Sequence, residues 1–420
     1  MKILLQNVQI LDKNSPFHKK KKNVLIQNGK ITQIGDKNYT SDKSITCDGM
    51  ILSPGWFDLG AYVGDPGYEH REDLNSLEAT AAAGGFTDIA VLPNTSPCIQ
   101  TKNDVAYIQR NNSTRLVQLH AIASVTKNNK GEELTEMIDL HEAGAIAFSD
   151  GLKPIWHTDI FLKSLQYLQR FDGVLIDRPE DVWLNMFGQM NEGVNSTRLG
   201  LKGMPRIAED VTVAKNIELL KYAGGRLHFS KVSSSKSLDS IRKAKKEGLR
   251  ISAGATTYQA LLDDSLLAEF DTNYKVNPPL REKSENDSLL KAIKDGTIDV
   301  LISGHMPVED EGKLLEFDLA DFGMMNLQTV ASQLVELSKS IPMEDLMDKI
   351  STAPRELLGL EEVKVDVGVT ATLTLFDPGC VWDYSDSKNK SKSKNSPWLG
   401  KKLTGRAVGV FNNSKYKLDV

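Results

Sequence analysis

Short runs of alternating apolar and polar residues, rich in β-branched side chains, occupy both ends of the chain and predict strands. At the N-terminal end these runs span residues 3–10, 24–27 and 30–34, with Asn28-Gly29 as a two-residue hairpin turn between the last two. At the C-terminal end, residues 371–376 and 402–411 predict strands, 377–379 a turn and 385–396 a polar loop. Two β-rich ends can form one small sheet domain beside a central domain.

The middle of the chain alternates between short apolar runs and longer amphipathic segments. The apolar runs, typical of buried strands, span residues 89–92, 118–121, 145–148, 173–176, 226–229, 250–253 and 300–303. The amphipathic segments, typical of helices, include residues 74–83, 133–143, 211–223, 237–247 and 285–295. Strands alternating with helices at this spacing indicate a parallel α/β sheet.

The number of units and the length of 420 residues favour a (β/α)8 TIM-like barrel over an open doubly wound sheet. No GxGxxG sequence follows the first strand, which weakens the dinucleotide-binding alternative. We therefore expect residues 1–50 and 365–420 to form a composite β-sandwich domain and residues 51–364 to form the barrel. In such a barrel, chemistry is expected just after the strands, on the C-terminal face.

Composition excludes several function classes. The chain is 40% hydrophobic and 25% charged, as in ordinary globular proteins, and its net charge of −5 gives no reason to expect nucleic acid as a partner. Its three cysteines are far apart and have no disulfide-like or metal-like spacing, which fits a reducing compartment. No apolar run suits a signal peptide or a membrane span. We expect a cytoplasmic protein that binds neither nucleic acid nor membrane.

Several segments at the expected strand ends resemble dihydroorotases of the long bacterial type, members of the amidohydrolase superfamily that close carbamoyl-aspartate to dihydroorotate. The segments that carry the resemblance run in order over nearly the whole chain: residues 53–58, 65–74, 84–87, 92–97, 147–151, 273–281, 299–300, 375–378 and 400–405. The resemblance implies a metal-dependent barrel enzyme of pyrimidine biosynthesis. Such a site needs neutral imidazoles that hold metal ions, because the metals must lower the pKa of a bridging water.

The resemblance also shows which residues stand at the family's site positions. The two histidines of the family's first metal-binding motif correspond here to Gly60 and Tyr62, and the following substrate-binding arginine corresponds to Gly64. The positions of the two later metal-binding histidines are occupied by Arg178 and Lys231. The catalytic aspartate position is occupied by Gly304 and a substrate-binding histidine position by Val308. We therefore expect the ancestral zinc site to be lost and no cofactor to be bound.

A few polar residues remain at positions that would line the pocket, and we interpret them as a vestigial pocket: Asp58, Asn94, Asp150, Asn277, Arg281 and His305. Each also has a purely structural explanation. Asp150 can be a turn anchor rather than a remnant of a bridging ligand. Asn94 can simply hold its loop, and Asn277 and Arg281 can shape the Pro278-Pro279 turn. His228, between Leu227 and Phe229, is expected to be a hydrogen-bonded core histidine.

Arg178 and Lys231 place positive charge where a metal ion would have been. We hypothesise that one or both point into the old cavity and pair with Asp58, Asp150 or Asp177, since a buried carboxylate without its metal needs a partner. The alternative is that both side chains extend into solvent.

Several functions are compatible with this pattern. Some bacterial dihydroorotase relatives without metal ligands serve as structural partners of aspartate carbamoyltransferase, so the resemblance makes a non-catalytic subunit or pseudoenzyme the first interpretation. An active dihydroorotase with an atypical site is a second. Metal-independent hydrolysis of a cyclic amide is a third, and its candidate groups are Tyr62, Asp65, Lys231 and His305. A small-molecule binding role for the pocket stays open, and a homodimer is the default assembly.

Overall fold

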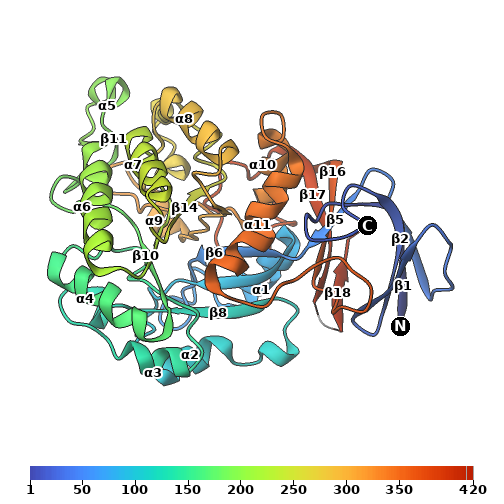
Figure 1. Ribbon diagram of the computed structural model, residues 1–420. Coiled ribbons are helices and arrows are strands. Elements are labelled where there is room, and N and C mark those ends of the chain that lie inside the picture. Colours follow the sequence, from blue (N-terminus) through green and yellow to red (C-terminus); the bar gives the residue numbers. More distant parts are fainter. Residues whose placement is uncertain (413, 420) are drawn as a thin grey trace.

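The computed structural model describes residues 1–412 and 414–419. Both ends of the chain join one eight-stranded sheet, drawn in blue and red beside the barrel in Figure 1. Its strands are β1 (Lys2–Ile10), β2 (Lys21–Gln27), β3 (Lys30–Gly35), β4 (Lys43–Thr46), β5 (Ile51–Pro54), β16 (Leu373–Asp383), β17 (Lys402–Asn412) and β18 (Lys415–Leu418). The sheet has its own apolar core, which includes Leu5, Val24, Leu373 and Val408.

Sequence and structure agree on most of this sheet. Asn28 and Gly29 have φ values of 50° and 75°, the left-handed backbone that a tight hairpin turn requires between β2 and β3. The prediction of a turn at residues 377–379 is wrong, because these residues belong to strand β16. The pairing of β16 with β17 changes register between Asp377 and Val381. Asp377 Oδ1 accepts hydrogen bonds from the backbone of Gly379 and Cys380, so a bulge replaces the turn. β5 pairs with β16, so residues 51–54 lie in this sheet and the barrel begins after them.

Eight parallel strands form a nearly closed barrel, which confirms the predicted fold. Its strands are β6 (Trp56–Ala61), β7 (Phe86–Val91), β8 (Gln118–Ala123), β9 (Ala147–Phe148), β10 (Val174–Asp177), β13 (Arg226–Phe229), β14 (Ile251–Thr256) and β15 (Val300–Ile302). Their order is sequential from β6 to β15. Asp58 on β6 accepts hydrogen bonds from the backbone and side chain of Ser303, just after β15, and so links the first and last strands.

The helices lie outside the barrel (Figure 1). They are α1 (Leu74–Gly84), α2 (Lys102–Gln109), α3 (Met137–Glu142), α4 (Thr158–Leu168), α5 (Val194–Leu199), α6 (Ile207–Ala223), α7 (Ser235–Lys246), α8 (Lys283–Lys294), α9 (Asp310–Lys313), α10 (Val330–Leu337) and α11 (Met343–Leu358). Helix α7 illustrates why the helices pack against the strands. Its buried Leu238, Ile241 and Ala244 recur at helical spacing and form one apolar face, which joins the core between helices and strands. A short ribbon of β11 (Met190–Asn191) and β12 (Gly203–Met204) precedes α6.

One predicted helix is shorter than expected. Residues 133–135 pair their backbone with residues 125–127, as shown by the hydrogen bonds from Lys127 N to Glu133 O and from Thr135 N to Val125 O. These bonds remove the first turn of the predicted helix at 133–143, so α3 begins only at Met137.

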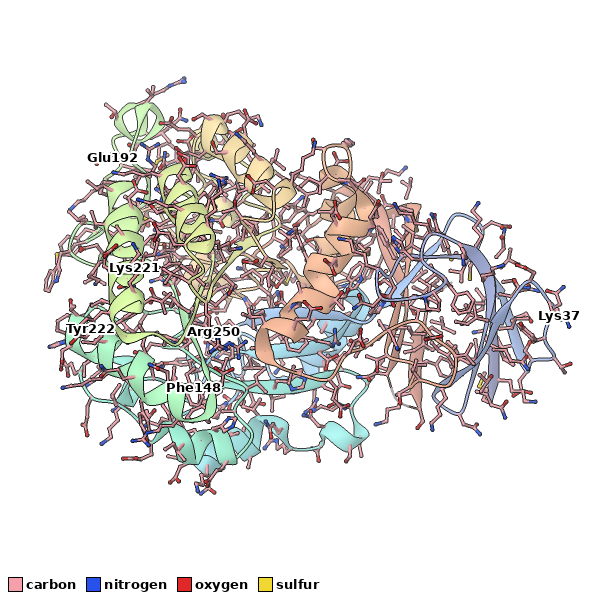
Figure 2. The ribbon with its side chains drawn as sticks, viewed as in Figure 1. Lys37, Phe148, Glu192, Lys221, Tyr222 and Arg250 are labelled. Atoms are coloured by element: carbon pink, nitrogen blue, oxygen red, sulfur yellow. The ribbon has the colours of Figure 1, made fainter. Side chains whose placement is uncertain are left out.

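The molecule is elongated, with Lys37, just after β3, and Tyr222 of α6 at opposite ends (Figure 2). Among the residues described, no helix is both long and apolar enough to cross a membrane.

Candidate functional site

A cavity of about 190 Å³ opens at the C-terminal ends of the barrel strands. Residues that follow four different strands contribute to its wall: Leu152 after β9, Arg178 after β10, Lys231 after β13 and Gly304 after β15. Of the positions singled out in the sequence, Arg178, Lys231, Asn277 and Gly304 meet here. The fold therefore gathers residues that are distant in sequence at the face where barrel proteins place their chemistry.

Arg178 and Lys231 both face this cavity rather than solvent, with exposed fractions of only 8% and 7%. The guanidinium of Arg178 forms a 2.5 Å ion pair with Glu180 Oε2. Asn277 Nδ2 donates to the same carboxylate oxygen at 3.4 Å. Burial and the neighbouring Arg178 lower the pKa of Lys231 to about 8, while Asp58 acts in the opposite direction. The wall of the cavity thus carries two buried cations.

Both cations face the cavity as hypothesised, but within the described residues neither forms an ion pair with Asp58, Asp150 or Asp177, so that part of the hypothesis is wrong. Each of the three carboxylates accepts hydrogen bonds from other groups. Ser303 donates to Asp58 from its backbone nitrogen at 2.6 Å and from its hydroxyl at 2.7 Å. Thr126 donates its backbone N–H to Asp150 at 2.8 Å and also its hydroxyl. Asp177 accepts from Asn216 Nδ2 at 2.9 Å. Burial raises the pKa of all three, for Asp150 and Asp177 to about 6.

Two further positions assigned to the pocket are engaged elsewhere. Arg281 contacts Ser233, Asn191 and Glu209 in a buried cluster and is absent from the cavity wall. Asn94 donates to Asp150 O at 3.0 Å and accepts from Leu152 N at 2.8 Å, so its amide holds the turn after β9. The polar contacts of both side chains are thus made away from the cavity wall.

The groups considered for metal-independent hydrolysis are not assembled into one site. His305 Nδ1 accepts from Asn326 N at 3.1 Å, and its Nε2 lies 3.4 Å from Glu72 Oε2, away from the cavity wall. Asp65 accepts from the hydroxyl of Tyr107 at 2.5 Å. Burial raises the pKa of Tyr62 to about 12, so its hydroxyl stays protonated at neutral pH. Only Lys231 of this group reaches the cavity.

The structure adds Tyr258 and Glu180, which the sequence interpretation did not single out. Tyr258 is buried after β14, and a β-carbon at Gly304 would lie 2.9 Å from its ring. Gly60 and Gly304 both have positive φ, at 118° and 64°, so any side chain there would be strained as well. The position of Tyr258 just after a barrel strand was the available signal. His228 is a core histidine as expected, with Nδ1 2.9 Å from the hydroxyl of Ser252.

The residues present do not fit a catalytic zinc ion. Zinc in hydrolases is held by imidazole, thiolate or carboxylate groups. Across residues 1–412 and 414–419, no three His, Cys, Asp or Glu side chains are placed to hold a metal ion. The charged and amide side chains that line the cavity are instead those of Lys231, Arg178 and Asn277, and the two cations repel a divalent metal ion.

Comparison of the whole chain with known proteins identifies its family. A Dihydro-orotase-like family model matches residues 49–237. The dihydroorotase of Citrifermentans bemidjiense is 35% identical over 413 residues, which is 97% of each chain. That of Ruminiclostridium cellulolyticum is 35% identical over 411 residues, covering 97% of this chain and 96% of its own. The solved L-hydantoinase (dihydropyrimidinase) of Arthrobacter aurescens shares the fold, with a TM-score of 0.85 at 20% identity over 99% of this chain and 95% of its own. The chain therefore belongs to the dihydroorotase family.

Proposed function

We propose that this protein is a dihydroorotase homologue without hydrolytic activity that acts as a structural or regulatory partner, with aspartate carbamoyltransferase as the first candidate. Its relatives are named dihydroorotases, hydrolases of cyclic amides in pyrimidine biosynthesis. The observation that carries the proposal is the chemistry of the cavity: Arg178 and Lys231 stand where a hydrolase of this kind needs neutral or anionic metal ligands.

The alternatives receive less support from the site. An active enzyme with an atypical centre would need a general base close to the cavity, and the carboxylates of Asp58 and Asp150 are occupied by Ser303 and Thr126. A metal-independent hydrolase would need Tyr62, Asp65 or His305 beside Lys231, and their contacts lie elsewhere.

A partner role needs an interface, and one loop after β10 offers apolar surface. Between Asp181 and Gly188 the chain turns outward, and Trp183 and Phe187 are 69% and 74% exposed. Leu184 and Met186 of the same loop are also exposed. Grouped apolar side chains of this kind mark protein interaction sites more often than single ones do. We propose this loop as the surface that contacts the partner.

The first experiment is elemental analysis of the purified protein together with a dihydroorotase assay with and without added zinc. The C. bemidjiense dihydroorotase, assayed in the same buffers, is the positive control. We expect no stoichiometric metal and no turnover in either direction. Near-stoichiometric zinc with turnover would overturn the non-catalytic proposal and mean that the site uses residues other than those described above.

The partner is tested by mixing the protein with aspartate carbamoyltransferase of the same organism and measuring the mass of the complex by sedimentation. The double variant Trp183→Ser/Phe187→Ser is expected to abolish the complex. Tyr222→Ser is the matched control, because Tyr222 is 79% exposed but lies alone on the outer side of α6 (Figure 2). No complex with the unaltered protein would exclude aspartate carbamoyltransferase as the partner.

A further inference from the structure

Lys231 differs from the other buried lysines in having no acceptor. Lys275 Nζ donates to Phe317 O at 2.6 Å, and Lys313 Nζ donates to Thr272 O and Asp321 O, both at 2.8 Å. Within the described residues, Lys231 Nζ makes no hydrogen bond or ion pair, although the side chain is 7% exposed and faces the cavity. The Lys231 side chain is buried and its ammonium borders the cavity, so the site suits a group that enters the cavity and brings an acceptor.

Arg178 supplies further donors at the same cavity. One terminal nitrogen, Nη2, is paired with Glu180, whereas the other, Nη1, has no partner in the part of the chain that the structure describes. A guanidinium presents several N–H groups in a fixed plane that matches an oxyanion. Two cations with free donors thus share one small cavity. Among the residues described, only the carboxylate of Glu180 forms an ion pair with either of them, and its partner is Arg178.

The rest of the wall is largely apolar. Tyr258, Val276, Phe322 and Met324 also line it. The volume of about 190 Å³ is more than ten times the roughly 10–15 Å³ that one water needs, so the cavity has room for a small organic molecule. A ligand that fits must combine an anionic end with an apolar body.

We propose that this cavity binds a small organic carboxylate, with its oxygens on Lys231 and Arg178 and its body against Tyr258 and Phe322. Inorganic phosphate fits less well, because its remaining oxygens would face an apolar wall without donors. The inference is independent of the proposed loss of activity, since binding can be measured whether or not turnover occurs.

The electrostatics of Lys231 agree with this assignment. Burial and Arg178 lower the pKa of Lys231 to about 8, so the side chain is still mostly charged at neutral pH. Of the other titratable groups around it, Asp58 is hydrogen-bonded to Ser303 and Glu180 to Arg178, and burial raises the pKa of Tyr258, which stays neutral. A bound carboxylate would supply the acceptor that these groups do not.

The proposal is tested on the full chain by calorimetric titration with three probes: benzoate, its neutral isostere benzamide, and inorganic phosphate. We expect benzoate to bind at least tenfold more tightly than either of the others. Benzamide binding as tightly as benzoate would overturn the role of charge, and phosphate binding as tightly would overturn the role of the apolar wall. Absence of benzoate binding at millimolar concentration would overturn the proposal altogether.

Variants then assign the contact to Lys231. Lys231→Met is expected to weaken benzoate binding at least tenfold, whereas Lys231→Arg, which keeps the charge, is expected to retain most of it. Lys221→Met is the control, because Lys221 belongs to α6, pairs with Glu218 and Glu247 and does not line the cavity (Figure 2). Unchanged binding in Lys231→Met would overturn the assignment. If that variant does not fold, the comparison of benzoate with benzamide on the unaltered chain decides.

Discussion

Tyr258 fills the space that a side chain at Gly304 would need: a β-carbon there would lie 2.9 Å from its Cε1 and 3.1 Å from its hydroxyl oxygen. Thr256 Cγ2 is nearer still, at 2.7 Å, and Gly304 has a φ of 64°. Gly304 stands where the family resemblance expects a catalytic aspartate. Thr256 and Tyr258 therefore occupy the space that an aspartate side chain at position 304 would need. The substitution Gly304→Asp alone cannot place a carboxylate there unless these two side chains move.

The first prediction concerns this packing. Gly304→Ala is expected to lower the free energy of unfolding by about 2–5 kcal/mol, which combines left-handed backbone strain of about 1–2 kcal/mol with overpacking of about 1–3 kcal/mol. Gly296→Ala is the control, because Gly296 has a φ of 82° with nothing within 4 Å of the added carbon. It should lose only the strain contribution. Equal losses in urea unfolding of the two variants would contradict the packing argument.

The fold could be predicted from the sequence because its signal is local. The apolar run at residues 89–92 overlaps β7 and the run at 226–229 coincides with β13, since a buried parallel strand is largely apolar on both faces. The turn at 377–379 could not be predicted correctly, because Asp-Pro-Gly favours a turn locally while pairing with β17 keeps the chain extended. Long-range strand pairing outweighed the local preference there.

The candidate site was less predictable because partner choice depends on three-dimensional geometry. The sequence indicated that Arg178 and Lys231 replace metal ligands, but it could not show that Ser303, 245 residues from Asp58, already satisfies that carboxylate. Nor could it show that Glu180, two residues from Arg178, turns back to pair with it. Which polar groups already have partners is a property of the packed structure.

The second prediction concerns the stability contribution of Lys231. Lys231→Met is expected to raise the free energy of unfolding at pH 7 by up to about 3 kcal/mol, since lowering the pKa from 10.5 to about 8 costs about 1.4 kcal/mol per unit. As pH rises from 8 to 10.5, the folded lysine loses its proton before the unfolded one, so the wild-type protein gains stability and the difference shrinks.

The difference in free energy of unfolding between the wild type and the variant, followed against pH, isolates the contribution of Lys231. Burial also lowers the pKa values of Lys275 and Lys313, but both lysines are present in both proteins, so their contributions cancel. Urea unfolding at several pH values between 7 and 10.5 measures it. Parallel pH profiles for the wild type and the variant would show that Lys231 is not a buried, unpartnered charge.

The third prediction treats Asp150 as a structural anchor. Both of its carboxylate oxygens accept from Thr126, one from the backbone and one from the hydroxyl. Asp150→Ala is expected to lower the free energy of unfolding by about 1–3 kcal/mol, because it leaves buried donors unsatisfied. Thr126→Val should lose part of the same interaction, so the double variant should lose less than the sum of the two single ones. Additive losses of stability in the double variant would contradict a direct contact between the two side chains. Added zinc should leave the free energies of unfolding of all these variants unchanged.

The last prediction concerns Glu180, which competes with a bound carboxylate for Arg178. Glu180→Gln removes the charge 2.5 Å from the guanidinium and leaves both cations free to contact the ligand. Affinity for benzoate is expected to rise about tenfold, the equivalent of about 1.4 kcal/mol. Glu218→Gln is the matched control, because it weakens an ion pair of 2.9 Å with Lys221 on α6, whose residues do not line the cavity. A fall in affinity would instead show that Glu180 holds Arg178 in its binding orientation, so calorimetric titration of the two variants distinguishes competition from positioning.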